Sequence, residues 1–155
     1  MSLATIRYEG PLYDGTDRSR GSIRLDVSTL DDVVLEPTWQ RLFFPYPETR
    51  AVTARCLPME EAFAEKIRAL GTRTRGRDLY DCWYLLNQDV TIDAGLVERK
   101  FAAVDATLDV TVTVTDAEFT RDLDVLLDHP PPYEEVVSTV MQRLEEAGLT
   151  VTDQR

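Results

Sequence analysis

The chain has 155 residues, 43% of them hydrophobic, so it can bury one sizeable core and is most simply a single domain or domain fragment. Its formal charge of −11 argues against a broad electrostatic surface for nucleic acid or for anionic membranes, so any phosphate-binding region must be local. No apolar run is long enough to span a membrane, and the first residues lack a signal-peptide pattern, so we expect a soluble, cytoplasmic protein. The single histidine and the two cysteines have no metal-ligand spacing, which argues against a zinc site.

The first third of the chain predicts a mostly antiparallel sheet. Apolar side chains alternate over residues 4–9 and 21–28, and turn-forming residues lie between these two segments. Residues 32–36 and 51–57 are predicted as a third and a fourth strand. Residues 37–49 hold several prolines and predict an irregular loop whose four aromatic rings pack on the sheet. An aromatic binding surface is the alternative for that loop.

Asp26 lies within the second predicted strand. Alternation places Ile23, Leu25 and Val27 on one face of this strand and Asp26 on the opposite, polar face. The pattern alone is compatible with a solvated charge on a half-exposed sheet.

Residues 58–71 predict an amphipathic helix that begins near Pro58 and is closed by Gly71 as a C-cap. Its apolar face is formed by Met59, Ala62, Phe63, Ile67 and Leu70. Lys66 falls in the middle of that face, where a leucine would be expected. The remaining charged side chains are predicted to point away from it: Glu60, Glu61, Glu65 and Arg68.

An arginine-rich segment follows this helix. Arg68, Arg73, Arg75 and Arg77 place four positive charges within ten residues of an otherwise acidic chain. This cluster is a candidate anion site. Ordinary ion pairs and interactions with the negative end of the helix are the alternative explanation.

A second helix is predicted over residues 77–86. Its apolar face is formed by Leu79, Cys82, Trp83 and Leu86, which leaves Asp78 and Asp81 three residues apart on another face. Two carboxylates are thereby held side by side. They could simply pair with nearby arginines, or one of them could position an arginine, a metal ion or an attacking group.

The rest of the chain is mainly helical. Three more helices are predicted, at 93–105, 116–127 and 133–147. Residues 107–115 alternate valine with threonine and predict a strand or an extended linker. The pattern is therefore α+β, with a sheet-rich part over residues 1–57 and a helical part over residues 58–155.

The segment AEKIRAL, followed by RGRDLYDCWYLL, resembles the AbiEii-type nucleotidyltransferase toxins of prokaryotic abortive-infection and toxin–antitoxin systems. IRLDVS upstream resembles the strand that supplies a later carboxylate in nucleotidyltransferase-like folds, so the resemblance covers residues 20–90. It implies a nucleotidyltransferase-like fold and transfer of a nucleotide from a nucleoside triphosphate to an acceptor such as tRNA. It also implies Mg²⁺ as cofactor and an antitoxin as a possible partner.

The same resemblance implies roles for particular residues. Lys66, Asp78 and Asp26 are the implied catalytic residues, and Asp26 is also the implied metal ligand. Arg77 and Asp81 are the implied substrate- or phosphate-binding residues, and the arginine cluster adds Arg73 and Arg75 as candidates for the same role. These residue types suit the chemistry, because cations stabilise the charge that develops on phosphate oxygens, while carboxylates hold Mg²⁺ or orient the attacking hydroxyl.

The sequence departs from the family in one respect. A Gly-Ser motif and an Asp-x-Asp pair normally precede these segments, and no Asp-x-Asp precedes residue 20. Asp122 and Asp124 form such a pair, but on a predicted helix near the other end of the chain. We therefore expect the later part of a nucleotidyltransferase domain, inactive on its own. The alternative is a non-catalytic module that binds phosphate or a partner through the arginines of residues 68–77.

Overall fold

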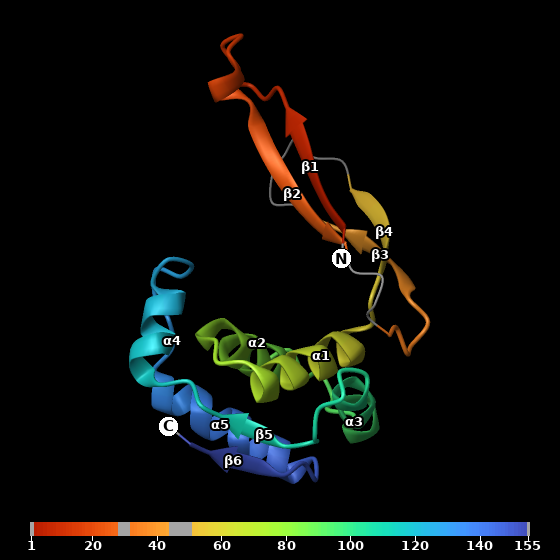
Figure 1. Ribbon diagram of the computed structural model, residues 1–155, viewed down its shortest axis with the longest axis vertical. Helices are drawn as coiled ribbons and strands as arrows, with labels where there is room; N and C mark the ends of the chain where they lie inside the picture. Colours follow the sequence, from red (N-terminus) through yellow and green to blue (C-terminus); the bar gives the residue numbers. More distant parts are fainter. Residues whose placement is uncertain (1, 28–31, 44–50, 155) are drawn as a thin grey trace. The chain divides into compact units, whose positions relative to one another are not determined.

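A computed structural model of the chain describes residues 2–27, 32–43 and 51–154, and it divides the chain into two compact units. The first unit is Met1–Asp32 and the second is Val33–Arg155. Helices and small sheets occur together, so the predicted α+β class is confirmed (Figure 1). The prediction of one domain or domain fragment over the whole chain stays a prediction.

The first unit is built on a hairpin of β1 (Ser2–Tyr8) and β2 (Gly21–Val27), paired antiparallel as predicted. Ile6 lies opposite Ile23, on the apolar face of the hairpin. Asp26 lies on the other face and is exposed, as the alternation of the sequence indicates.

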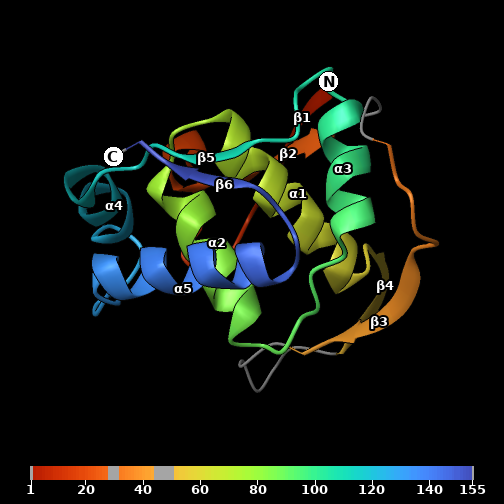
Figure 2. The same cartoon turned by 90° about the horizontal axis from the view of Figure 1, so that it is seen from below.

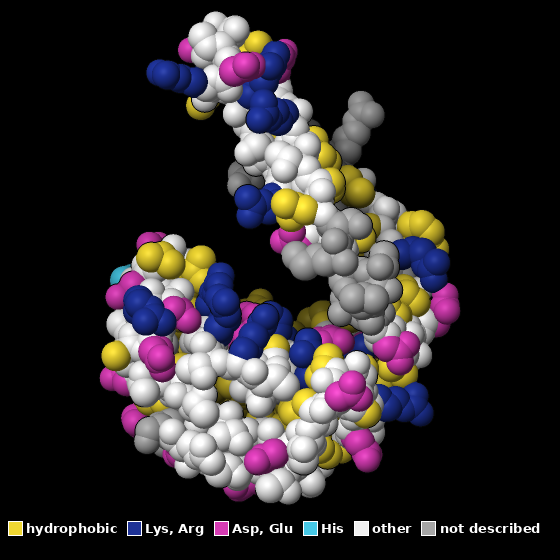
Figure 3. All heavy atoms as spheres, viewed as in Figure 1, with side chains coloured by type: hydrophobic (Ala, Val, Ile, Leu, Met, Phe, Trp, Pro, Cys, Tyr) yellow, Lys and Arg dark blue, Asp and Glu magenta, His cyan; other side chains and the backbone are white. Residues whose placement is uncertain are grey.

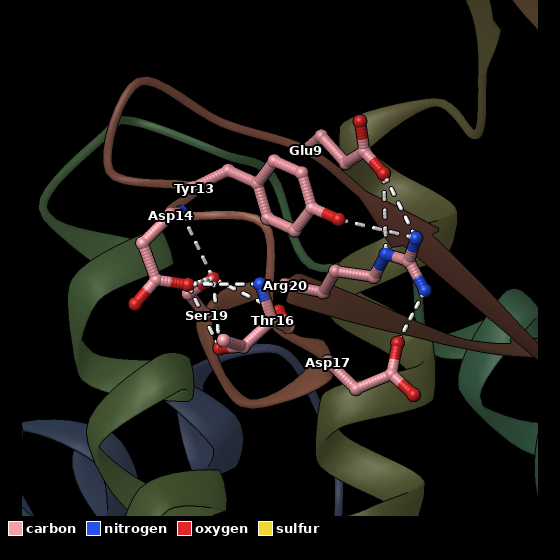
Figure 4. Close-up of polar contacts among 7 residues, drawn as sticks. All are labelled: Glu9, Tyr13, Asp14, Thr16, Asp17, Ser19 and Arg20. Carbon is pink, nitrogen blue, oxygen red and sulfur yellow. Dashed lines mark hydrogen bonds and ion pairs between the residues drawn. The ribbon is translucent and has the colours of Figure 1, made fainter.

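The loop between these strands is ordered by its own side chains. Asp14 Oδ1 accepts hydrogen bonds from the Thr16 amide at 2.9 Å, from Thr16 Oγ1 at 2.8 Å and from Ser19 Oγ at 2.5 Å (Figure 4). A one-turn 3₁₀ helix, η1 (Asp17–Ser19), brings Ser19 back towards Asp14. The end of the hairpin is therefore a structured turn.

This network sets the pH at which the turn should open. The hydrogen bonds from Ser19 and then Thr16 lower the pKa of Asp14 from 3.8 to about 2. Because the folded pKa lies below the unfolded one, this contribution to stability is complete above pH 3.8 and is lost as the pH falls towards 2. We expect the NMR signals of the Asp14 carboxyl carbon and the Thr16 amide to titrate together near pH 2. A shared midpoint near 3.8 would contradict the network, and Asp14→Asn should abolish the titration.

The second unit begins with an antiparallel hairpin of β3 (Thr38–Leu42) and β4 (Val52–Cys56). β4 matches the strand predicted over residues 51–57. The strand predicted over residues 32–36 is wrong. In that segment, the backbone amides do not pair with a neighbouring strand of the described chain. They donate instead to a carboxylate on the first helix.

The loop predicted over residues 37–49 is also wrong where β3 lies. Pro37 precedes the strand, so it removes no ladder hydrogen bond. Trp39 and Phe43 are 70% and 76% exposed, so these two rings do not pack on the sheet as predicted. The other two aromatic residues of this segment, Phe44 and Tyr46, lie outside the described residues.

The described part of the second unit contains five α-helices: α1 (Met59–Thr72), α2 (Gly76–Leu86), α3 (Ala94–Ala102), α4 (Asp116–Leu123) and α5 (Tyr133–Glu146). Each confirms a predicted helix, with ends that differ by a few residues. Among the residues that the structure describes, no helix combines the length and apolarity needed to cross a membrane.

One core holds these helices together. α1 packs on α2 and α3, and α2 packs on α4 and α5 (Figures 1 and 2). β5 (Val110–Val112) lies within the segment predicted as a strand or linker, and it pairs in parallel with β6 (Val151–Asp153), which the sequence reading missed. Three phenylalanines are fully or almost fully buried in this core: Phe63, Phe101 and Phe119.

Gly71 does not cap α1, contrary to the prediction. The helix continues to Thr72, and Arg73 is its extended C-cap residue. A Cβ on Gly71 would lie 2.7 Å from the Phe101 ring and 3.0 Å from the Asp109 carbonyl oxygen. The missing side chain therefore allows α1 to approach the segments around α3 and β5 closely.

Candidate phosphate-binding site

A pocket of about 270 Å³ lies where α1 and α2 meet. It is lined by Lys66, Arg73, Arg75, Arg77, Asp78 and Asp81. Lys and Arg side chains gather over these two helices in Figure 3. Six of the seven residues that the sequence singles out are thus brought together, although their chemical roles stay predictions.

Asp78 and Arg73 form the inner wall of the pocket. The Asp78 side chain is only 3% exposed, and its two carboxylate oxygens accept from Arg73 Nε at 2.7 Å and from Nη2 at 2.9 Å. This bidentate geometry fixes the plane of the guanidinium. Hydrogen bonding to Asp78 also raises the pKa of Arg73, which therefore stays charged.

Lys66 lies beside this pair. Its Nζ is 2.6 Å from Asp81 Oδ2 and 3.7 Å from Asp78 Oδ1. The side chain is 38% exposed, so its stem crosses the apolar face of α1 while its charged end reaches the pocket. Its position on the apolar face is therefore explained by two carboxylates of the neighbouring helix.

Arg75 and Arg77 differ from these cations. Both are exposed, and neither forms an ion pair with a carboxylate of the described chain. Arg68, which the sequence places in the same cluster, pairs with Glu65 at 2.9 Å and does not line the pocket. The pocket thus carries four cations and two carboxylates, and two of its cations, Arg75 and Arg77, form no ion pair with a described carboxylate.

The start of α2 is held by a residue far away in the sequence. Asp122 Oδ2 on α4 accepts a hydrogen bond from the Gly76 amide at 3.0 Å. A Cβ on Gly76 would lie 2.7 Å from the Phe119 Cα, so only glycine lets the two helices come this close. Burial opposes ionisation of Asp122, but hydrogen bonds from Arg121 and Gly76 lower its pKa overall. Asp122 belongs to the Asp-x-Asp noted in the sequence, yet its structural role is to position the turn that carries Arg75 and Arg77.

The two carboxylates of the pocket are already paired with cations of the chain. No cluster of three or more potential metal ligands occurs among the described residues. Asp26, the predicted metal ligand, belongs to the first unit, whereas the pocket belongs to the second. Its predicted role in metal binding therefore stays a prediction.

Cys82 lies on α2 behind the pocket. It is completely buried, and this burial, together with the negative charges of Asp78 and Asp81, raises the pKa of its thiol far above the usual range. The thiol therefore stays protonated and serves as core material rather than as a nucleophile.

Comparison with known proteins yields one family. The family described as nucleotidyl transferase AbiEii toxin, Type IV TA system, matches residues 3–146. Neither the curated proteins nor the solved structures gave a match. The match extends well beyond the segments that carry the sequence resemblance, and it covers most of the chain. The chain belongs to the AbiEii family of nucleotidyltransferase toxins.

Proposed function

We propose that, in a complete nucleotidyltransferase chain, the pocket between α1 and α2 binds the phosphates of a nucleoside triphosphate during transfer of a nucleotide to an acceptor such as tRNA. Membership of a nucleotidyltransferase toxin family supports the reaction class. The observation that carries the site is the pocket itself, which gathers four cations in a chain of net charge −11. The family belongs to toxin–antitoxin systems, so an antitoxin partner is part of the proposal.

We infer different roles for the side chains of this pocket. Arg75 and Arg77 would contact the phosphates directly, because they make no ion pair with described carboxylates. Lys66 would stabilise the charge that develops on the phosphate oxygens during transfer. Asp78 and Asp81 would position the cations, and this role fits the burial of Asp78 better than direct contact with substrate.

Mg²⁺ does not fit this pocket, since a divalent cation would compete with Lys66 and Arg73 for the same oxygens. This mismatch also favours the second candidate function, a non-catalytic module in which the arginines bind a phosphate group and the carboxylates only orient them.

Neutralising the two available arginines tests phosphate binding. The double variant Arg75→Gln, Arg77→Gln is expected to bind tripolyphosphate at least about tenfold more weakly in isothermal titration calorimetry, because each charge-assisted hydrogen bond contributes about 1.5–3 kcal/mol. The matched control is Arg41→Gln, Arg99→Gln, which removes the same charge from exposed positions elsewhere. An equal loss in both double variants would mean that net charge, and not the pocket, binds the phosphates.

A transfer assay separates the two candidate functions. The chain, extended by the upstream Gly-Ser and Asp-x-Asp segment that the resemblance implies, is incubated with labelled nucleoside triphosphates, tRNA and Mg²⁺. Incorporation of label that disappears with Lys66→Ala would support transfer at this pocket. Tripolyphosphate binding without any incorporation would favour the non-catalytic module.

A further inference from the structure

A second arginine-lined pocket lies entirely within the first unit. It has a volume of about 320 Å³ and is lined by Arg7, Asp17, Arg18, Arg20 and Ser22. Arg7 and Ser22 lie opposite each other on the polar face of the β1–β2 hairpin, and the other three residues come from the turn. Basic side chains gather near this end of the hairpin in Figure 3.

One of the three arginines is structural. Arg20 donates to Glu9 Oε1 at 2.9 Å and pairs with Asp17, and its guanidinium also reaches the Tyr13 hydroxyl at 3.3 Å (Figure 4). Asp17, the one carboxylate in the pocket lining, is therefore already neutralised. Arg20 anchors the turn and is not free for a ligand.

Arg7 and Arg18 remain available. Both are exposed, and neither forms an ion pair with a carboxylate of the described residues. They line the same pocket from a strand and from the turn. Two available guanidiniums facing one small cavity suit a phosphate group, whose oxygens match the fork of an arginine.

The polar face continues this pocket along the strands. Arg24 lies two residues beyond Ser22 on the same face, about 6.6 Å along β2, and Thr5 lies opposite Arg24. Guanidinium and hydroxyl donors therefore follow one another in a row. A single small anion would use only the pocket, whereas a chain of phosphates would use the whole row.

We propose that this row, Arg7, Arg18, Ser22 and Arg24, binds consecutive phosphates of an RNA strand. The choice of RNA rests on the proposed nucleotidyl transfer to an acceptor such as tRNA, and the pocket itself does not depend on it. The row lies on the face opposite the apolar face that carries Ile6 and Ile23. In a chain of net charge −11, such a local basic surface confines RNA to one face of the hairpin.

The test measures how RNA affinity depends on salt. The variant Arg7→Gln, Arg18→Gln is compared with wild-type protein and with the charge-matched control Arg41→Gln, Arg99→Gln, using a twelve-nucleotide single-stranded RNA. Each phosphate neutralised in a single strand contributes about 0.7 to the slope of log affinity against log salt. If each arginine neutralises one phosphate, the hairpin variant should have a slope shallower by about 1.4. Neither arginine takes part in the ion pairs that hold the turn, so folding should be preserved.

The inference would be overturned if the Arg7→Gln, Arg18→Gln variant had the same salt slope as the control variant. It would also be overturned if this variant bound inorganic phosphate more weakly but bound RNA as wild-type protein does. The result is independent of the pocket between α1 and α2. If the Arg75→Gln, Arg77→Gln variant binds tripolyphosphate as tightly as wild type, the proposed function fails, even if the Arg7→Gln, Arg18→Gln variant has a shallower salt slope for RNA. If the first variant loses tripolyphosphate affinity but the second has the same salt slope as its control, the RNA inference fails and the proposed function stands.

Discussion

Replacing Lys100 with methionine is expected to lower the free energy of unfolding of the second unit by about 3–5 kcal/mol, because it leaves a buried carboxylate without its counter-charge. Lys100 Nζ lies 2.5 Å from Glu61 Oε1 and 3.1 Å from Glu65 Oε1. The side chains of Lys100 and Glu61 are 3% and 0% exposed. Methionine fills a similar volume, so the loss should reflect charge rather than packing.

Glu61 also holds the segment that precedes β3. Its carboxylate oxygens accept from the Val34 amide at 2.8 Å and from the Leu35 amide at 2.7 Å. Burial opposes ionisation of Glu61, but the hydrogen bonds from Lys100 and from these two amides lower its pKa overall. The carboxylate therefore contributes to stability above its unfolded value of 4.5, and this contribution is lost as the pH falls through its folded value.

Chemical denaturation of wild-type and variant protein measures the loss. Arg99→Met is the matched control, since this exposed neighbour on α3 has no buried partner and should change stability by less than about 0.5 kcal/mol. Without Lys100 the burial of Glu61 favours its protonated form, so the difference between wild type and Lys100→Met should shrink at acidic pH. A loss below about 1 kcal/mol at neutral pH would contradict the assignment of a buried, mutually dependent pair.

The burial of Glu61 could not be predicted from the sequence. Helical periodicity correctly identifies α1 and its large buried apolar side chains, but it places Met59, which is 42% exposed, on the apolar face and Glu61 on the exposed side. The Glu61 carboxylate is buried because its partners lie far away in the sequence, at separations of 26, 27 and 39 residues. Local periodicity carries no information about such distant partners. The same contacts make the predicted strand at residues 32–36 wrong, since Glu61 takes the hydrogen bonds that a neighbouring strand would receive.

The candidate site was more accessible to prediction because most of it is local. Lys66, Asp78 and Asp81 lie on two consecutive helices, and helical spacing alone places the two carboxylates on one face. The support from Asp122 was not predictable in this way, since it acts across 46 residues and depends on the close approach of α2 and α4 at Gly76.

Replacing Asp78 with asparagine is expected to weaken phosphate binding, although it makes the pocket more positive. Asp78→Asn raises the positive charge of the pocket by one, so if the carboxylate acted only as a charge, tripolyphosphate would bind more tightly. We expect the opposite, a loss of about tenfold, because Asp78 holds Arg73 through two charge-assisted hydrogen bonds worth about 1.5–3 kcal/mol each. An asparagine can accept through only one oxygen, which leaves the guanidinium free to rotate out of the pocket.

Glu60→Gln is the matched control for this change, since it removes one negative charge from an exposed position on α1 without touching the pocket. Its tripolyphosphate affinity should stay equal to that of wild type or rise slightly. Because Asp78 is almost fully buried, thermal unfolding of each variant must show that the second unit is folded at the temperature of the titration. Tighter binding by folded Asp78→Asn would show that Arg73 binds phosphate best when released, and the positioning role of Asp78 would then be wrong.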